Sequence, residues 1–130
     1  MRLLVCGSRD WTANEAVYAV LTGIYKMHCE ETFDDWPPDR FVIISGAARG
    51  ADTYAAEWAK MKAGVDLELY PAKWREHGKA AGPIRNQQML DEGKPNMVLA
   101  FSNFPLTTGT ADMVYRAKQR GIVCWQMGNP

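Results

Sequence analysis

A short apolar run that leads directly into a glycine-containing turn constrains this chain more than any other feature. Residues 41–44 (Phe-Val-Ile-Ile) have the composition of a buried strand, and residues 45–52 (Ser-Gly-Ala-Ala-Arg-Gly-Ala-Asp) follow at once. With a helix beginning near Asp52, this turn directs free backbone N–H groups and the positive end of the helix dipole at the space above the strand. The arrangement favours a bound anion, most often a phosphate.

The residues of this turn suit a phosphate site, although a simpler interpretation is also open. Gly46 and Gly50 lack a Cβ and would let a ligand approach closely, and Arg49 supplies a planar set of cationic donors. Asp52 would orient Arg49 or cap its own helix, and Ser45 begins the turn. The alternative is a tight strand-to-helix connection with a surface arginine. Neither GxxxxGK[ST] nor GxGxxG occurs in the sequence.

Strand-like and helix-like segments alternate along the whole chain. Besides residues 41–44, we predict strands at 2–6, 66–70, 96–101 and 122–125, and helices at about 13–28, 52–63, 84–91 and 111–120. This alternation predicts one α/β domain over residues 1–130, a Rossmann-like, doubly wound and mainly parallel sheet of about five strands flanked by helices. The segment 66–70 alternates polar and apolar residues, so we place it nearer a sheet edge.

Local signals refine these boundaries. Thr12 and Glu15 have the spacing of a capping box, with Thr12 as the N-cap of the first helix. Residues 29–40 and 72–83 are predicted to be loops. Three large apolar side chains are expected in the core: Trp58, Met61 and Met97.

The predicted topology places the ligand site at one rim of the sheet. In a doubly wound sheet, ligands bind beyond the carboxyl ends of the strands, where the strand order reverses. The loops expected there, which are also rich in Gly, Arg, Lys, Ser, Thr and Trp, are 7–11, 45–52, 71–82 and 102–110. Two independent arguments therefore point to the same rim.

Charge and composition exclude some classes of function. Fifteen Lys and Arg residues balance fifteen Asp and Glu residues, which argues against non-specific nucleic-acid binding but leaves room for a local basic site. The chain has no apolar run of membrane-spanning length and no signal peptide, so we expect a cytoplasmic protein that contacts no membrane. Its three cysteines form no CxxC pair, so we expect no metal site and no required cofactor.

Four motifs occur in order along nearly the whole chain. They are residues 7–11 (Gly-Ser-Arg-Asp-Trp), 45–52, 78–86 (Gly-Lys-Ala-Ala-Gly-Pro-Ile-Arg-Asn) with Met89, and 109–112 (Gly-Thr-Ala-Asp). Together they resemble the YspA-related branch of the SLOG superfamily, a group common in bacteria and their phages. That superfamily also includes the LOG-type nucleotide phosphoribohydrolases and the DprA/Smf proteins.

The resemblance implies a Rossmann-like sheet that binds a nucleotide or a nucleotide-derived ligand, such as an ADP-ribose-like molecule. Residues 46–50 match the family's second-strand turn, and residues 109–110 match the end of its PGGxGT phosphate loop. Here that loop, residues 105–110, reads Pro-Leu-Thr-Thr-Gly-Thr and lacks the two central glycines. Thr107 and Thr108 would offer hydroxyl donors in their place.

The resemblance also implies how an enzyme of this type would work. LOG enzymes carry a glutamate three residues after the threonine of Gly-Thr; that position is Met113 here, and Asp112 lies one residue earlier, turned by about 100° on a helix. Arg85 matches an arginine of the third motif. An N-glycosidic hydrolase acting on a nucleotide would therefore have Arg85, Asp112 and Asp10 as candidate catalytic residues.

The first turn supplies further candidates. Gly7 and Ser8 follow the first strand directly, Arg9 would pair with a phosphate, and Asp10 would bind a ribose hydroxyl. The alternative is that Arg9 and Asp10 pair with each other. Trp11 is a candidate for stacking on a base, with packing at the start of the first helix as its alternative.

The 71–86 region completes the set. Lys79 and Arg85 would bring two positive charges over one anion or form a solvated basic loop, Asn86 would bond a base edge or a backbone carbonyl, and Trp74 is the second stacking candidate. The residues predicted to bind ligand or phosphate are Gly7, Ser8, Arg9, Ser45, Gly46, Arg49, Gly50, Asp52, Lys79, Arg85, Asn86, Thr108, Gly109 and Thr110.

Three functions compete on this evidence. The leading hypothesis is a sensor or binding module for a phosphorylated nucleotide or nucleotide-derived metabolite. The second is a LOG-like phosphoribohydrolase that cleaves an N-glycosidic bond. The third is DprA-like binding of single-stranded nucleic acid, by Trp11 and Trp74 among Arg9, Lys73, Arg75 and Lys79. A homodimer, as in relatives, is the candidate assembly, and a phage-encoded protein would act in the host cytoplasm.

Overall fold

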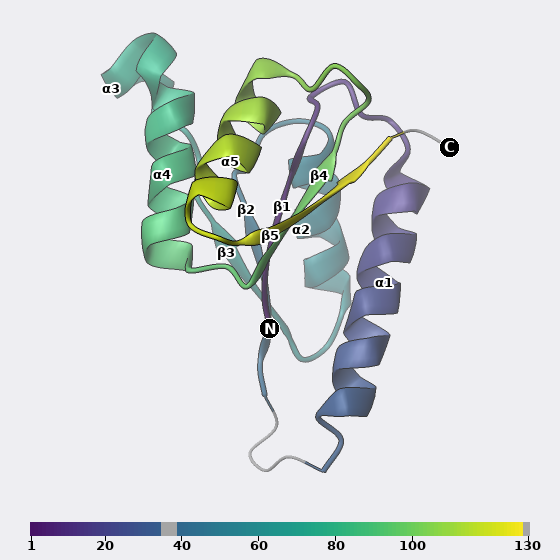
Figure 1. The fold of residues 1–130 in the computed structure, drawn as a ribbon. Helices are drawn as coiled ribbons and strands as arrows, with labels where there is room; N and C mark the ends of the chain where they lie inside the picture. The colour runs from purple at the N-terminus through teal and green to yellow at the C-terminus, as the bar shows by residue number, and fades with distance from the viewer. Residues whose placement is uncertain (35–38, 129–130) are drawn as a thin grey trace.

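The computed structural model describes residues 1–34 and 39–128. They contain one five-stranded sheet. The strands are β1 (Arg2–Gly7), β2 (Phe41–Ser45), β3 (Val65–Leu69), β4 (Met97–Phe101) and β5 (Val123–Met127). Their order is β3-β2-β1-β4-β5, and every neighbouring pair is parallel. The predicted doubly wound α/β architecture is confirmed, with β3 at a sheet edge as expected (Figure 1).

Helices cover both faces of this sheet. Helices α1 (Asn14–Glu31) and α2 (Ala51–Met61) lie on one face, and α4 (Ala81–Gly93) and α5 (Thr108–Gln119) lie on the other (Figure 1). Two short helical segments, α3 (Trp74–His77) and η1 (Gly78–Ala80), precede α4. None of the helices that the structure describes is long and apolar enough to cross a membrane.

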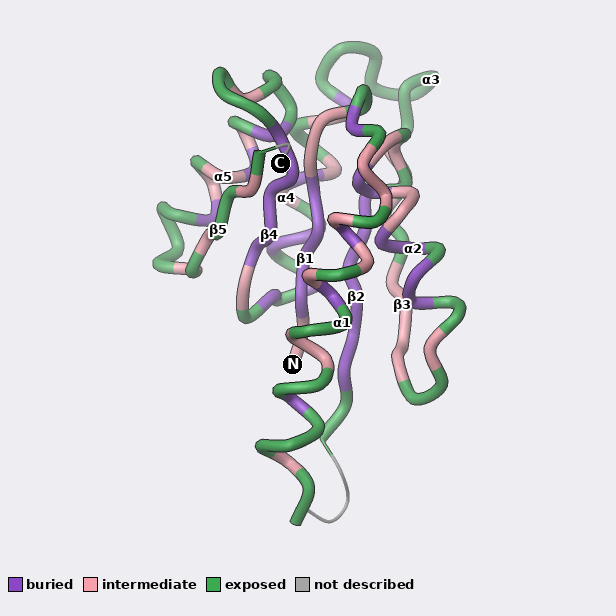
Figure 2. Tube along the Cα trace, turned by 90° about the vertical axis from the view of Figure 1, so that its right-hand side faces the viewer, coloured by how far each residue is buried: buried purple, intermediate pink, exposed green. Residues whose placement is uncertain are grey.

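Each face of the sheet has its own hydrophobic core. Trp58 and Phe41 pack edge to face under α1 and α2, with their ring centroids 6.2 Å apart. Met89 and Met113 fill the other core, beneath α4 and α5. Strands β1, β2 and β4 are almost wholly buried, whereas β3 and β5 at the edges are not (Figure 2). Parallel strands covered on both faces are expected to be continuously apolar, as these three are.

The strand order reverses between β1 and β4. From β1 the chain passes through α1 to β2 on one side, and after β3 it crosses through α4 to β4 on the other side. The helices that follow these strands therefore diverge above the carboxyl ends of β1 and β4. This is the topological switch point at which ligands bind in such folds.

The first helix differs from the prediction at both ends. Its N-cap is Ala13 and makes no side-chain cap, so the capping box predicted from Thr12 and Glu15 is wrong. The amide of Asn14 instead donates to the carbonyl oxygen of Thr12, a tight turn that leaves Thr12 outside the helix. Helix α1 continues to Glu31, so the loop predicted over residues 29–40 begins later than expected; residues 35–38 of that loop lie outside the described residues.

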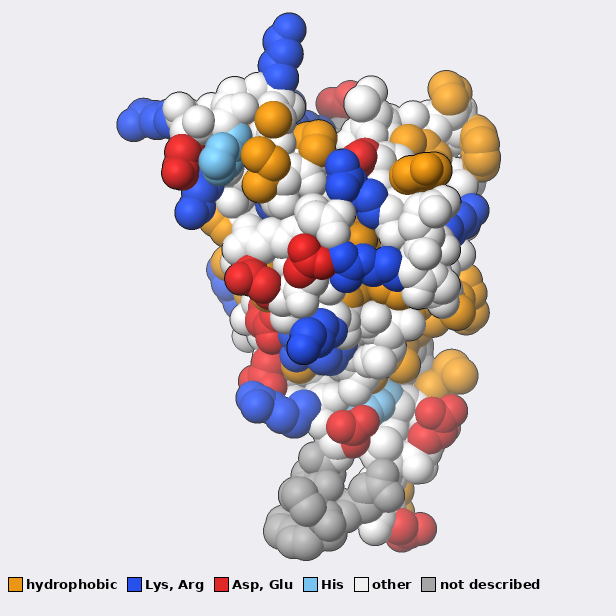
Figure 3. All heavy atoms as spheres, turned by 60° about the vertical axis from the view of Figure 1, so that its left-hand side comes forward, with side chains coloured by type: hydrophobic (Ala, Val, Ile, Leu, Met, Phe, Trp, Pro, Cys, Tyr) orange, Lys and Arg blue, Asp and Glu red, His pale blue; other side chains and the backbone are white. Residues whose placement is uncertain are grey.

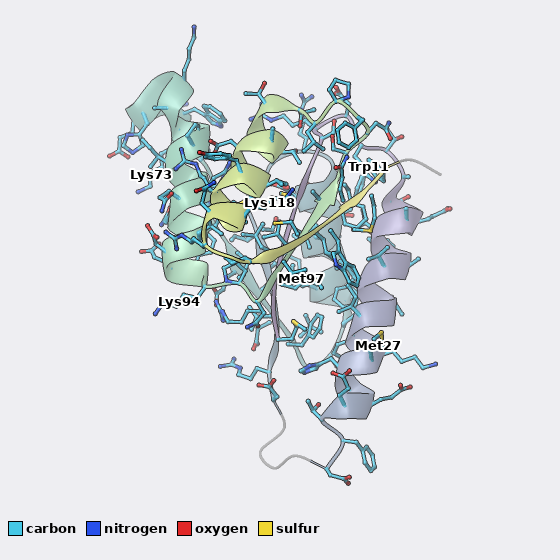
Figure 4. The ribbon with its side chains drawn as sticks, viewed as in Figure 1. Trp11, Met27, Lys73, Lys94, Met97 and Lys118 are labelled. Carbon is cyan, nitrogen blue, oxygen red and sulfur yellow. The ribbon has the colours of Figure 1, made fainter. Side chains whose placement is uncertain are left out.

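Two predicted loops contain helix. Residues 74–80 of the predicted 72–83 loop form α3 and η1. Helix α5 begins at Thr108 rather than at residue 111, so Gly109 and Thr110 lie in its first turn. Among the predicted core side chains, Trp58 is buried and Met97 is half-buried (Figure 4), but Met61 is 64% exposed and does not belong to the core.

Candidate functional site

A cavity of about 520 Å³ opens at the switch point. Its walls come from the turn after β1, the start of α2, the α3–α4 segment and the first turn of α5. It gathers fourteen residues that we predicted for the site: Gly7, Ser8, Arg9, Asp10, Arg49, Asp52, Trp74, Lys79, Arg85, Asn86, Thr108, Gly109, Thr110 and Asp112. We call it the main cavity.

The first turn of α5 presents backbone donors to the main cavity. The amides of the first helical turn have no acceptor within their own helix, and the side chain of the N-cap Thr107 does not bond to any of them. The Thr107 hydroxyl instead lies 2.8 Å from the hydroxyl of Thr110. A Cβ on Gly109 would meet no atom within 4 Å, so the space in front of this turn is open. This end of α5 suits an anion.

The turn after β2, residues 45–52, does not leave all of its backbone amides free for a ligand, as we had expected. The Asp52 carboxylate accepts a hydrogen bond from the Ala48 amide at 3.2 Å, and the Ser45 hydroxyl accepts one from the Ala47 amide at 3.2 Å. The Ser45 hydroxyl also donates to the carbonyl oxygen of Asp52. Two amides that we expected to face a phosphate are therefore satisfied by side chains of the turn itself. Ser45 is fully buried and does not line the main cavity, so its predicted contact with a ligand there is wrong.

The glycines of this turn make room for the protein itself rather than for a ligand. A Cβ on Gly46 would collide with the guanidinium of Arg85, and one on Gly50 would collide with the backbone of Ser8. Gly50 also has a φ of +79°, a left-handed conformation that glycine adopts without strain. These contacts already occupy the space beside both glycines, so their role in close ligand approach stays a prediction.

Asp52 and Arg85 form the buried electrostatic centre of the site. Asp52 is 5% exposed, and this burial raises the pKa of its carboxyl to about 6, against opposing effects of Arg85, the Ala48 amide and Arg9. Arg85 donates through Nη1 to the carbonyl oxygens of Gly46 and Tyr70. Burial lowers the pKa of Arg85, which nevertheless stays charged. Asp52 therefore faces Arg85, not Arg49 as we had expected, and it does not cap its helix.

Most of the positive charge around the main cavity has no carboxylate partner. Among the residues that the structure describes, four of the eight arginines form ion pairs with carboxylates, and three of the other four, Arg9, Arg49 and Arg85, line the cavity. In the view of Figure 3, Lys and Arg side chains (blue) lie at the upper end of the molecule, around α3. The Asp52 carboxylate lies near Arg85 and Arg9 without forming an ion pair with either, so an anionic ligand would compete with this one carboxylate for them.

Asn86 and Asp112 belong to a network that joins α4 to α5. The side-chain amide of Asn86, 4% exposed, donates to Asp112 Oδ2 at 3.0 Å and to the carbonyl oxygen of Gly109 at 3.2 Å. Arg116 Nε lies within 3.0 Å of both Asp112 oxygens. Asn86 thus fixes the carboxylate and the first turn of α5 relative to each other. The Asp112 carboxylate is held by two partners in this state.

The two stacking candidates have different surroundings. Trp11 is 3% exposed, packs edge to face on Phe101 and donates through Nε1 to the carbonyl oxygen of Ala13. Its predicted stacking on a base is wrong, because no face of the ring is accessible. Trp74 is 47% exposed and lines the main cavity, and the Arg9 guanidinium carbon lies 5.2 Å from the centre of its ring.

A second cavity, of about 320 Å³, adjoins the first. Arg9, Ala48, Arg49, Trp74 and Arg85 line both cavities. The second is completed by Gly46, Ala47, Pro71 and Ala72. We call it the annex.

Sequence reasoning missed the floor of the main cavity. Cys6 and Met89 line it, and both are buried. Burial raises the pKa of the Cys6 thiol well above its usual range, so this side chain acts as an apolar surface. Met89 was part of a motif, but only the packing of α4 on the sheet reveals that it faces the ligand space. Within residues 1–34 and 39–128, no group of three or more His, Cys, Asp or Glu side chains is placed to hold a metal ion.

Comparisons with known proteins add independent evidence. The model of a family described as the YspA, cpYpsA-related SLOG family matches residues 1–77, from β1 through α3. The Gene 61 protein of Mycobacterium phage D29 is 34% identical over 134 residues, covering 98% of this chain and 97% of the phage protein. No solved structure matches.

Proposed function

The chain belongs to the YspA, cpYpsA-related SLOG family, and we propose that it binds a phosphorylated nucleotide or nucleotide-derived metabolite in the main cavity. SLOG domains generally bind nucleotide-derived ligands. The observation that carries the proposal for this chain is the uncapped first turn of α5, which opens into a cavity bordered by cations without carboxylate partners. A helix N-terminus and free arginines together favour a phosphate.

The lining suggests how such a ligand would lie. The phosphate would accept bonds from the amides of Thr108 and Gly109, near Lys79. The exposed Asp10 would accept a bond from a sugar hydroxyl, since its carboxylate has no hydrogen-bond partner among the described residues. A base would pack on the exposed part of the Trp74 ring. The sulfur-containing side chains of the cavity floor would exclude water beneath the ligand.

Two competing hypotheses have less support. Asp112, a candidate carboxylate for N-glycosidic hydrolysis, has both oxygens bonded to Arg116. For single-stranded nucleic acid, the proposed stacking surface is incomplete, because Trp11 is buried and lies far across the molecule from Lys73 (Figure 4). We therefore favour ligand binding over both.

Calorimetry with a matched pair of ligands tests the proposal. AMP should bind and raise the melting temperature of the protein by mass action, whereas adenosine, which lacks the phosphate, should bind at least about tenfold more weakly. Lys79→Gln, which removes a positive charge from the lining of the main cavity, should weaken AMP binding several-fold. Lys94→Gln at the far end of α4 is the control and should leave AMP affinity unchanged (Figure 4).

Two results would contradict the proposal. One is the absence of binding tighter than about 1 mM for AMP, ADP and ADP-ribose alike. The other is equal affinity for AMP and adenosine. Chromatography of the same mixtures for free adenine shows at once whether AMP is cleaved, which would restore the hydrolase hypothesis.

A further inference from the structure

The annex has a different charge pattern from the main cavity. Asp10, Asp52 and Asp112 line the main cavity, so its cations face carboxylates as well as polar groups. Among the residues that the structure describes, no acidic side chain lines the annex, whereas three arginines do, around a volume of about 320 Å³. Its charged lining is therefore wholly positive. Such a surface favours an anion over a neutral group.

The arginines of the annex keep unused donors. Arg49 makes no hydrogen bond or ion pair with any described residue. The guanidinium of Arg9 lies over the ring of Trp74 and makes no hydrogen bond with any described residue. Arg85 donates to carbonyl oxygens through Nη1 and to Asn86 through Nε, which leaves Nη2 without a hydrogen bond to a described residue, although the nearby Asp52 carboxylate partly offsets its charge. Guanidinium groups with free donors are well suited to phosphate.

The annex and the α5 turn lie beyond different strands. The annex is lined by residues that follow β2 and β3, whereas α5 follows β4 on the other side of β1. Arg9, Trp74 and Arg85 line both cavities, whereas Gly46, Ala47, Pro71 and Ala72 line the annex but not the main cavity. A ligand in the main cavity would therefore reach the annex by extending past the three shared side chains.

We propose that the annex is a second anion subsite, so that the preferred ligand carries two separate phosphate groups. One group would lie at the first turn of α5 and the other among Arg9, Arg49 and Arg85, with the sugar between them. This inference rests on the proposed function. It selects, within nucleotide-derived ligands, those with phosphates at two positions over those with one phosphate or one contiguous chain.

Calorimetry with adenosine 3′,5′-bisphosphate, AMP and ADP tests this inference. The bisphosphate should bind at least about tenfold more tightly than AMP, and more tightly than ADP, whose phosphates are contiguous. Arg49→Gln should remove about tenfold of the affinity for the bisphosphate. Ala72 lines the annex but not the main cavity, so Ala72→Asp, which places a carboxylate in the annex, should weaken binding of the bisphosphate about tenfold and that of AMP by less than about threefold. Arg75→Gln on α3, outside both cavities, is the matched control.

The outcomes separate this inference from the proposed function. If AMP binds but the bisphosphate binds no more tightly, the second subsite is refuted and the proposed function stands. Equal losses for AMP and the bisphosphate in Ala72→Asp would also refute it, since the annex would then not distinguish the two ligands. If no nucleotide binds, the proposed function and the inference fail together.

Discussion

The buried carboxylate of Asp52 leads to the sharpest stability prediction. In the folded protein, the water around this carboxylate is replaced by one backbone amide and a nearby guanidinium. The pKa of the Asp52 carboxyl is therefore raised from 3.8 to about 6. Burial outweighs the attraction of Arg85 in this balance. Asp52→Asn keeps an oxygen that can accept the Ala48 amide but removes the charge.

The sign and size of the effect follow from linkage. Between about pH 4 and pH 6 the folded protein holds a proton that the unfolded chain has lost, so the stability of the wild type falls as the pH rises through this window. A shift of about two pKa units corresponds to about 3 kcal/mol. Asp52→Asn lacks this titration. Its free energy of unfolding relative to the wild type should therefore increase by about 3 kcal/mol between about pH 3 and pH 7.

Urea unfolding across this pH range measures the difference, in which the other titrating groups cancel. Asp91→Asn is an informative control, because the bond from Arg120 lowers the pKa of Asp91. The relative stability of that variant should change in the opposite direction, falling as the pH rises. A flat or falling curve for Asp52→Asn would refute the reasoning, since it would mean that attraction to Arg85 exceeds the cost of burial.

Three further substitutions separate stability from binding. Gly109→Ala should raise the free energy of unfolding, measured with urea, by about 0.5 kcal/mol, because alanine favours helix and its Cβ meets open space. The same change should weaken AMP binding, measured by calorimetry, because the Cβ covers the proposed anion site. Gly46→Ala should lower the free energy of unfolding by about 1–3 kcal/mol, because its Cβ collides with Arg85, and an unchanged urea midpoint would contradict this. Trp74→Ala should weaken AMP binding while changing the unfolding free energy by less than about 1 kcal/mol, because the ring is half exposed; equal AMP affinity would exclude stacking there.

The architecture was predictable because local pattern and topology agree. Apolar runs such as residues 41–44 and 97–101 are buried on both faces, so their composition alone identifies central strands. Helix ends were less predictable. Thr12 and Glu15 have capping-box spacing, but a tight turn involving Asn14 decides where α1 begins. The exposure of Met61 was hidden for a similar reason, since it lies at the last turn of α2, beyond the core.

The location of the candidate site could be predicted from the sequence, but the contacts of its individual residues could not. Loops at the carboxyl ends of parallel strands must converge, so most of the predicted residues meet in one cavity. Their individual roles depend on side chains that arrive from elsewhere. Arg85 lies thirty-nine positions after Gly46 in the sequence, yet it occupies the space that this glycine leaves. No local pattern in residues 45–52 contains that information.

A comparison of the N-termini of α2 and α5 explains why we propose the anion site at α5, whereas the sequence led us to expect it at α2. Both α2 and α5 begin with glycine and small residues, and both offer the same dipole. In α2, however, the second helical residue is Asp52, whose buried carboxylate binds the preceding turn and supplies the negative charge internally. In α5 the corresponding position is Gly109, which supplies no charge and leaves open space. A helix start with its own buried carboxylate is therefore a weaker anion site than one with glycine there, and this difference is the reason for proposing the phosphate site at α5 rather than at α2.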